Sequence, residues 1–531
     1  MGKEKKKTKQ NSERVLLLEK GKRGVFNVLF SKTTVIVLVI LLELVLFITF
    51  FNYIIRYMSF FIVFFVLIAI AMIVYLVHTE TTPEVKLSWI AVVILIPIAG
   101  ALIYIWIHTE LGFKKKKRAI EKMEKETEKY EHDDKDVWNR MQETPGSYNG
   151  TASYLRNKGG FSVFDGTDVE YLPSGEAFFE AMLDELEKAE HFIFMEFFII
   201  QEGYMWGRVL DVLERKARAG VEVRLMYDGT CAIYRLPYNY PKKIEKLGIR
   251  CKMFSQLRPF ISTSYNNRDH RKILVIDGKV AFTGGSNVAD EYINRKHPFG
   301  QWKDASVKLV GAAADAFTLM FLRMWNIDER EPDSDYGKYL GRIKSKKQTP
   351  GFVVPYGDSP YRAERVGEYA YIDIINNASK YVYIMSPYLI LDEKMTAALT
   401  LAAKKGVDVR IILPHIPDKK YVFMLAKSHY AQLMAAGVKI YEYTPGFIHS
   451  KVFLSDGCHA VVGTVNLDYR SLYLHFECAA YLSYVPAVSD IEKDFKETFE
   501  ISTLVTKEMV KNEKFGVKLA GRLLKIIAPM M

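Results

Sequence analysis

The chain has 531 residues, more than one hydrophobic core usually organises, so we expect two or more folded units. Its 73 Lys and Arg exceed its 62 Asp and Glu, and the net charge of +11 favours an anionic partner, either nucleic acid or an acidic membrane surface. The four cysteines are scattered, without a C-x-x-C pair, which argues against a disulfide framework or a zinc site and favours reduced, buried thiols.

Three apolar stretches follow a basic tail over residues 1–32. They cover residues 33–55, 57–77 and 87–107, and each is about 20 residues long, which is enough for a helix to cross the hydrocarbon core of a bilayer. A cleaved signal peptide would instead show one short apolar region before a cleavage site with small residues. We therefore expect residues 33–108 to form a multi-pass transmembrane region of a cell membrane.

The charges around these stretches bear on their orientation. Basic residues precede the first stretch and follow the last, and such flanks favour the cytoplasmic side. Three crossings would place the two flanks on opposite sides, so one stretch could be re-entrant or interfacial, with Glu43 and Arg56 as the polar residues to consider. We place the remainder of the chain on the cytoplasmic side. Residues 109–150 are dense in Glu, Lys and Asp, which predicts a solvated helical linker that lifts the next domain off the bilayer.

From about Tyr154 onward, short β-rich runs alternate with amphipathic helices. A buried strand is predicted over Phe192–Ile200, a helix follows through Arg218, and a second strand covers Gly220–Tyr227. This order of strand, helix and strand predicts an α/β fold in which helices cover both faces of a sheet.

The same order returns in the second half of the chain, which indicates an internal duplication. The segment Gly220-Val-Glu-Val-Arg224 is nearly identical to Gly406-Val-Asp-Val-Arg410, and further landmarks correspond in the same sequence. We therefore predict two similar lobes, over residues 151–345 and 346–531, with a linker near Lys344–Val354, where Pro350 and Gly351 interrupt the pattern.

Each half contains the same histidine motif, in which His and Lys two positions apart are followed by Asp-Gly and then, after a further strand, by Asn. The residues are His270, Lys272, Asp277 and Asn287 in the first half, and His449, Lys451, Asp456 and Asn466 in the second. Residues two apart in a strand point to the same face. Asp-Gly is a strong hairpin signal, so the following strand brings each Asn back beside its own His and Lys.

This set of side chains, present twice, suits phosphoryl transfer. Lys and Asn supply donors for the oxygens of a phosphoryl group, and two imidazoles can flank the phosphorus, one attacking and one protonating the leaving oxygen. The product of that attack is a phosphohistidine, which an incoming alcohol resolves. We expect no metal and no cofactor, because lysines beside the histidines repel a divalent cation. Asp277 and Asp456 belong to the motif, but they could serve only to form the hairpins.

The paired H-x-K-x4-D element resembles the signature of the phospholipase D superfamily, and the resemblance covers everything from about Tyr154 to the C-terminus. Within that superfamily the chain is most similar to the bacterial cardiolipin synthases. The segments that carry this second resemblance are Pro97–Gly100, Gly284–Tyr292, Gly463–Ser471, Leu474–Glu477 and Ala528–Met531. His475 departs from the family, which commonly has Asn at this position.

The resemblance implies two lobes, with mixed sheets flanked by helices, that share one active site at their interface. It implies condensation of two phosphatidylglycerol molecules to cardiolipin with release of glycerol. His270 would be the nucleophile and His449 the acid and base, although the pseudo-symmetry allows the two roles to be exchanged. The residues implied to hold the phosphate are Lys272, Lys451, Asn287 and Asn466. Glu477 is implied to orient a histidine, and Asp304 either does the same in the first half or is a surface acid.

Alternatives to this function remain open. Water could resolve the intermediate, which would make the chain a phospholipase D-type hydrolase, and other phosphatidyl acceptors are conceivable. A membrane-tethered nuclease and a non-catalytic lipid-binding scaffold are weaker alternatives, and we expect anionic membrane lipids, not nucleic acid, as partners. The stretch Phe515–Ile527 predicts an amphipathic helix that lies either on the membrane surface or against the core.

Overall fold

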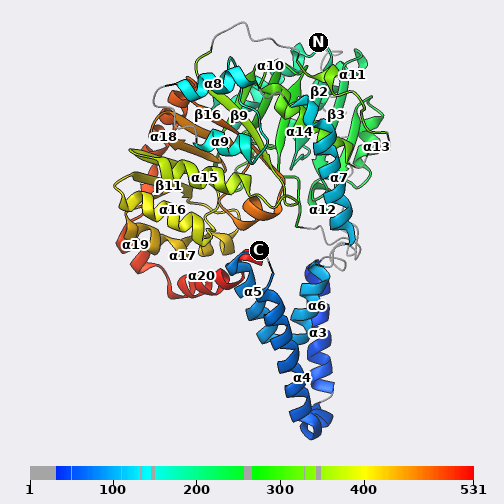
Figure 1. The fold of residues 1–531 in the computed structure, drawn as a ribbon, viewed down its shortest axis with the longest axis vertical. Helices are drawn as coiled ribbons and strands as arrows, with labels where there is room; N and C mark the ends of the chain where they lie inside the picture. Colours follow the sequence, from blue (N-terminus) through cyan, green and yellow to red (C-terminus); the bar gives the residue numbers. More distant parts are fainter. Residues whose placement is uncertain are drawn as a thin grey trace, which may run out of the picture.

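The computed structural model describes residues 32–49, 51–79, 81–108, 111–131, 134–144, 150–255, 266–327, 329, 331–341 and 349–530. A stalk of helices projects from a larger α/β body (Figure 1). The basic tail over residues 1–32 lies outside the described residues, except for Lys32.

The stalk consists of α3 (Lys32–Thr49), α4 (Phe51–Val77), α5 (Pro83–Leu95) and α6 (Pro97–His108). Among the described residues, only α4 is long and apolar enough to cross a membrane; its segment Phe60–Val77 has a mean hydropathy of 3.2. The apolar parts of α3 and α6 are shorter.

The third apolar stretch is not one continuous helix, so the prediction of a single helix over residues 87–107 is wrong. Pro97 cannot continue the hydrogen-bond ladder of α5, and the chain turns back at Ile96. The rings of Trp89 in α5 and Tyr104 in α6 lie 5.1 Å apart, so the two helices form a hairpin. Their 13 and 12 residues are each too few for the about 20 that a crossing needs.

The linker helix α7 (Leu111–Thr127) packs against the body instead of standing free in solvent as predicted. Ile120 and Met123 are buried beside α14 (Ala314–Asn326). Arg323 of α14 donates to Thr127 at 2.6 Å and to Glu131 at 2.6 Å. The linker is therefore a structural part of the first lobe.

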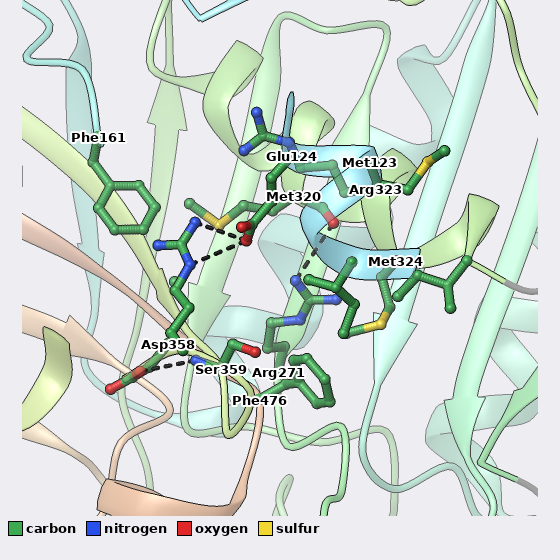
Figure 2. A pocket seen from close by; sticks show the side chains of 14 residues that line it. Met123, Glu124, Phe161, Arg271, Met320, Arg323, Met324, Asp358, Ser359 and Phe476 are labelled. Atoms are coloured by element: carbon green, nitrogen blue, oxygen red, sulfur yellow. Dashed lines mark hydrogen bonds and ion pairs between the residues drawn. The ribbon is translucent and has the colours of Figure 1, made fainter. Parts of the chain in front are cut away.

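The same helix also reaches the second lobe. Arg362 donates to Glu124 of α7 at 3.0 and 2.7 Å. Both residues line a small cavity of 60 Å³. Figure 2 shows Glu124 and Arg323 on one side of this cavity and Arg271 and Phe476 on the other. Because neighbouring strand residues point to opposite faces, Arg271 turns toward this cavity while His270 turns away from it. Helix α7 thus lines the same small cavity as the segment that carries the first histidine.

The first lobe is built on a seven-stranded mixed sheet in the order β1-β8-β6-β5-β2-β3-β4. The strands are β1 (Asp168–Leu172), β2 (Phe192–Phe197), β3 (Glu222–Asp228), β4 (Arg250–Phe254), β5 (Lys272–Ile276), β6 (Val280–Gly284) and β8 (Ser306–Val310). Its helices include α10 (Gly175–Lys188), α11 (Tyr204–Arg218), α12 (Cys231–Tyr234), α13 (Tyr240–Glu245) and α14. Strand β2 pairs with β3 in parallel and with β5 antiparallel.

The second lobe repeats this plan on an eight-stranded sheet in the order β17-β12-β11-β10-β14-β15-β16-β9. The strands are β9 (Phe352–Asp358), β10 (Tyr381–Met385), β11 (Asp408–Pro414), β12 (Lys439–Tyr443), β14 (Val452–Ser455), β15 (His459–Gly463), β16 (Glu477–Ser483) and β17 (Ser502–Leu504). Its helices include α15 (Val366–Asn377), α16 (Glu393–Lys404), α17 (Lys420–Ala436), α18 (Ala487–Glu500), α19 (Lys507–Asn512) and α20 (Phe515–Ile527). Strand β10 pairs with β11 in parallel and with β14 antiparallel, as β2 does with β3 and β5, which confirms two similar α/β lobes with mixed sheets.

The lobes interlock more than the predicted boundary at residue 151 implies. Helix α9 (Gly150–Asn157) precedes the first lobe in sequence but packs on the second, where Thr151 donates to Asp373 at 2.7 Å and Tyr154 to Glu364 at 2.8 Å. One buried apolar core runs through both lobes.

Helix α20 connects the second lobe to the stalk at the base of the body (Figure 1). A side chain at Gly521 would meet the Met424 carbonyl oxygen at 2.5 Å, so this glycine allows α20 to lie directly on α17. The Ser88 hydroxyl of α5 donates to the Ile526 carbonyl at 2.6 Å. On the outer side, the side chains of Phe515 and Leu523 are exposed.

The motif aspartates close the hairpins after β5 and β14. Asp277 and Asp456 both have φ of 54°, a left-handed conformation that Asp tolerates better than most residues. The Asp277 carboxylate accepts the backbone N–H groups of residues 190–192 at 2.7–2.8 Å. The Asp456 carboxylate accepts those of residues 379–381 at 2.7–2.9 Å.

We predict that Asp277→Ala lowers the free energy of unfolding by about 2–3 kcal/mol, because three backbone donors at the start of β2 lose their acceptor. Thermal unfolding of the purified protein in detergent measures this loss. Lys279→Ala in the same turn is the control. Equal stability of the two variants would contradict a structural role for Asp277.

Candidate active site

The two histidine motifs meet at one cavity between the lobes. His270 precedes β5 and His449 precedes β14, and both line a cavity of 740 Å³. Asn287 and Asn466, which follow β6 and β15, line the same cavity. The duplicated residues that the sequence predicted to converge are therefore brought together here, although they lie 179 positions apart (449 − 270) along the chain.

Each histidine is held by a carboxylate from the other lobe. The Nδ1 atom of His270 lies 2.9 Å from both Glu477 oxygens, and Glu477 begins β16 of the second lobe. The Nδ1 atom of His449 lies 2.8 Å from Asp304, which precedes β8 of the first lobe. Both carboxylates are fully buried. In each ring this contact leaves Nε2 as the nitrogen that is available to a substrate.

Backbone hydrogen bonds between the lobes support these contacts between each histidine and the carboxylate of the other lobe. The His270 N–H donates to the Phe476 carbonyl at 2.9 Å, one residue before Glu477. The His449 N–H donates to the Lys303 carbonyl at 2.7 Å, one residue before Asp304. Next to the second contact, β7 (Gln301–Lys303) and β13 (Gly446–Ile448) form a parallel two-stranded sheet between the lobes. The main chain therefore fixes each histidine beside its partner carboxylate.

Burial and neighbouring charges keep both histidines neutral. Burial lowers the pKa of His270 to about 3, against the opposing effect of Glu477. Burial, and then the Lys451 ammonium, lower the pKa of His449 to about 4. The Glu477 and Asp304 carboxylates are also buried, but the adjacent histidines outweigh that burial and hold the pKa of each carboxyl below its ordinary value. Neutral imidazoles with anchored Nδ1 atoms suit nucleophilic attack and proton transfer at Nε2.

The two lysines lie beside their histidines. The Lys272 ammonium donates to the His270 carbonyl at 2.6 Å, and the Lys451 ammonium lies 2.9 Å from Nδ1 and 3.1 Å from Nε2 of His449. Burial lowers the pKa of Lys272 to about 8 and that of Lys451 to about 7. Two buried cations beside one cavity favour an anionic ligand such as a phosphodiester.

The two asparagines are held by the protein itself. The Asn287 side chain accepts the Ile199 N–H at 2.9 Å and donates to the Tyr292 hydroxyl at 2.7 Å. Asn466 donates to Ser471 at 2.9 Å. Each NH₂ group has a second hydrogen that can still reach the cavity. The structure does not bring Asp277 or Asp456 to the cavity, because both lie at the far ends of their strands.

Several cavity residues were missed by the sequence analysis. The ring of Phe198 lies 4.9 Å from the ring of His270, and the rings of Tyr292 and Trp302 lie 5.3 Å from that of His449. These aromatic residues fix the planes of the imidazoles. No spacing rule identifies them, although Tyr292 ends the segment that contains Asn287.

His475 adds a third imidazole behind His270. Its ring centre lies 5.5 Å from that of His270, and its Nδ1 lies 3.6 Å from Glu477. Ligand-type atoms of His270, His475 and Glu477 lie within 4.8 Å of one another, an arrangement that a cation could occupy. Glu477 already accepts from Thr464 and His270, and the Lys272 ammonium is close enough to His270 to lower its pKa. These charges fit an anion better than a metal ion.

Comparison with known proteins agrees with this geometry. A family model described as "Cardiolipin synthase, PLD-like domain" matches residues 182–325 and 371–499. An uncharacterized protein of Streptococcus mutans is 48% identical over 87% of this chain and its own full length, and a cardiolipin synthase of Geobacillus kaustophilus is 37% identical over 68% of this chain and 72% of its own.

A solved structure shares the fold. The phosphatidylserine synthase of Haemophilus influenzae superposes with a TM-score of 0.55 at 15% identity, over 72% of this chain and 98% of its own. The match of the family model to both lobes, together with the Geobacillus relative, establishes the family. The chain belongs to the cardiolipin synthase family of phospholipase D-like proteins.

Proposed function

We propose that this protein is a phosphatidyltransferase that condenses two phosphatidylglycerol molecules to cardiolipin and releases glycerol. The observation that carries the proposal is the pair of neutral histidines on one cavity, each anchored at Nδ1 by a carboxylate of the other lobe. The relatives named cardiolipin synthase support this choice of phospholipid substrate.

The first half of the reaction cleaves the donor lipid. Nε2 of His270 attacks the phosphorus, the bond from phosphorus to the glycerol oxygen breaks, and His449 passes a proton to that oxygen. The proton comes from the pair formed by His449 and Lys451, whose ammonium lies 3.1 Å from Nε2. Lys272 and Lys451 stabilise the charge on the phosphoryl oxygens, and the amide groups of Asn287 and Asn466 add neutral donors.

The second half transfers the phosphatidyl group. A hydroxyl of the second phosphatidylglycerol gives its proton to His449 and attacks phosphorus, and the bond to His270 breaks with its electron pair returning to Nε2. Glu477 and Asp304 keep both rings oriented through this exchange of roles. Hydrolysis would use the same residues with water as acceptor.

We further propose that the stalk lies in a membrane, with α4 as one crossing, the 18-residue helix α3 as a second crossing despite its shorter apolar part, and the hairpin of α5 and α6 as a re-entrant segment. Leu and Phe side chains of the stalk are exposed along its length, which suits lipid and not water. A re-entrant hairpin returns the chain to the side from which it entered, so the basic residues before α3 and after α6 share the cytoplasmic side. The catalytic lobes then face the cytoplasm.

Helix α20 provides a second contact with the same membrane. Phe515, Leu519 and Leu523 recur at helical spacing and are 77%, 45% and 58% exposed. Lys518 and Arg522 lie beside this apolar stripe, where they suit the anionic headgroups of the surface. The opposite face of the helix packs on α17. In this proposal one face of α20 lies on the membrane surface and the other against the core, so each of the two alternatives from the sequence applies to one face.

His270→Ala is expected to abolish cardiolipin formation, and His449→Ala to reduce it by about 10²–10⁴-fold, the usual contribution of a general acid and base. Both variants should remain membrane-bound and folded at the assay temperature, although less stable, because each leaves a buried carboxylate without its imidazole. The assay incubates purified enzyme with labelled phosphatidylglycerol vesicles and identifies every lipid formed. Phosphatidic acid as the sole product of the unmodified enzyme would instead identify a hydrolase, and wild-type rates for both variants would refute the histidine mechanism.

The pH dependence follows from the lysines. Their ammonium groups are lost as the pH rises through about 7 for Lys451 and about 8 for Lys272. Because the histidines stay neutral down to about pH 4, kcat/KM for phosphatidylglycerol should be highest between these limits and fall on the alkaline side. Initial rates at subsaturating substrate measure this profile. A rate that rises steadily to about pH 10 would contradict it.

The membrane contact of α20 predicts that a fluorophore on Leu523→Cys lies within the headgroup region of the bilayer. Depth-dependent quenching by lipid-attached quenchers in phosphatidylglycerol vesicles should be strong at this position. Lys496→Cys on α18, an exposed residue on the body, is the matched control and should not be quenched. Equal quenching at both sites would exclude the proposed contact.

A further inference from the structure

The wall that the second lobe contributes to the cavity carries one further cation. Lys419 precedes α17, and its side chain is 45% exposed. Its ammonium lies 2.8 Å from the Tyr388 hydroxyl and contacts Asp418, and all three residues line the cavity. Two contacts leave the ammonium with a third hydrogen for a ligand.

This group lies on the side of His449. Tyr388 donates to Asp418 at 2.8 Å, and Tyr292 lines the same cavity. The ring of Tyr292 in turn lies 5.3 Å from that of His449. Lys419 and Tyr388 therefore belong to the same cavity wall as His449, which the second lobe also contributes.

Apart from the two motif lysines beside the cavity, the other cations of the cavity wall belong to the first lobe. Arg235 donates to Glu291 at 2.9 Å and also contacts Gln201, and Lys296 lies 3.5 Å from Asp290. Among the described residues that line the cavity, Lys419 is the only Lys or Arg from the second lobe. The acceptor must enter on the side opposite the nucleophile His270. Lys419 is the cation that lines the cavity on this acceptor side.

The acceptor lipid brings a charge that glycerol and water lack. Phosphatidylglycerol presents its terminal hydroxyl three carbons away from its own phosphodiester anion. While the donor phosphoryl group is bound to His270, it occupies Lys272 and Lys451. A second anion therefore needs a separate cation, placed beyond His449 by the length of a glycerol unit.

We propose that Lys419 binds the phosphodiester of the acceptor phosphatidylglycerol and thereby favours the anionic lipid over neutral acceptors in the second half of the reaction. This inference rests on the proposed function. In this step the acceptor oxygen bonds to the donor phosphorus, its proton passes to His449, and the bond between phosphorus and His270 breaks with its electron pair returning to Nε2. Lys419 contributes only the position of the acceptor.

The test compares two acceptors with the full-length enzyme in vesicles. Labelled phosphatidylglycerol is the donor, and unlabelled phosphatidylglycerol or added labelled glycerol is the acceptor, the latter measured by exchange into the lipid. Lys419→Met should lower the ratio of kcat/KM for the lipid to that for glycerol by about tenfold, the usual effect of losing a hydrogen bond between charged groups. The share of phosphatidic acid should rise, because water faces less competition.

Two further variants make the result specific. Lys419→Arg keeps the charge and should retain most of the preference, while Lys420→Met removes the adjacent exposed lysine, which does not line the cavity, and should leave the ratio at the wild-type value. The inference is overturned if Lys419→Met leaves the ratio of kcat/KM for the lipid to that for glycerol unchanged. It is also overturned if Lys296→Met, and not Lys419→Met, loses the preference for the lipid acceptor. Failure of the unmodified enzyme to form any cardiolipin would refute the proposed function itself, which is a separate outcome.

Discussion

The structure depends on an exchange of carboxylates between its lobes. Glu477 of the second lobe holds His270 of the first, and Asp304 of the first lobe holds His449 of the second. Neither lobe alone anchors the Nδ1 atom of its own motif histidine, so the two halves of the duplication are complete only when they face each other. The backbone contacts at Phe476 and Lys303 place both pairs in register and make docking of the lobes a condition for the site.

Burial makes each carboxylate depend energetically on the histidine of the other lobe. A buried carboxylate without a partner is costly, and removal of one member of a buried pair usually destabilises a protein by about 3–5 kcal/mol. The contacts that satisfy Glu477 and Asp304 are therefore also contacts that hold the interface together. The shared apolar core and the contacts of α7 with both lobes support the same arrangement from behind.

Much of the site could be predicted from the sequence because it rests on local rules. The two-residue period of a strand places His270 beside Lys272, and the Asp-Gly turn returns the chain toward Asn287. The partner of each histidine could not be derived in this way. Asp304 and Glu477 lie 145 and 207 positions from the rings they bind, and only the docking of the lobes brings them there.

Other differences have equally specific causes. Residues 87–107 form one apolar stretch, so hydropathy alone predicts one helix. Pro97 divides the stretch into two helices, and a hydropathy average does not contain this information. Helix α7 is rich in charge, which suggested a solvated linker. It nevertheless buries Ile120 and Met123 beside α14, Arg362 pairs with Glu124 within the helix, and Arg323 pairs with Glu131 just after it. Asp277 shares a motif with the catalytic residues but acts on backbone donors at the other end of the sheet.

The hydrogen bond between Ser88 and the carbonyl of Ile526 joins positions 438 residues apart, one in the stalk and one near the end of the chain. With a second attachment at that point, the lobes cannot swing freely about the linker helix. In the proposed orientation the mouth of the cavity then keeps a constant height and tilt above the headgroups. Encounter with substrate becomes a two-dimensional problem, in which lipids diffuse laterally to a stationary opening and none has to leave the leaflet.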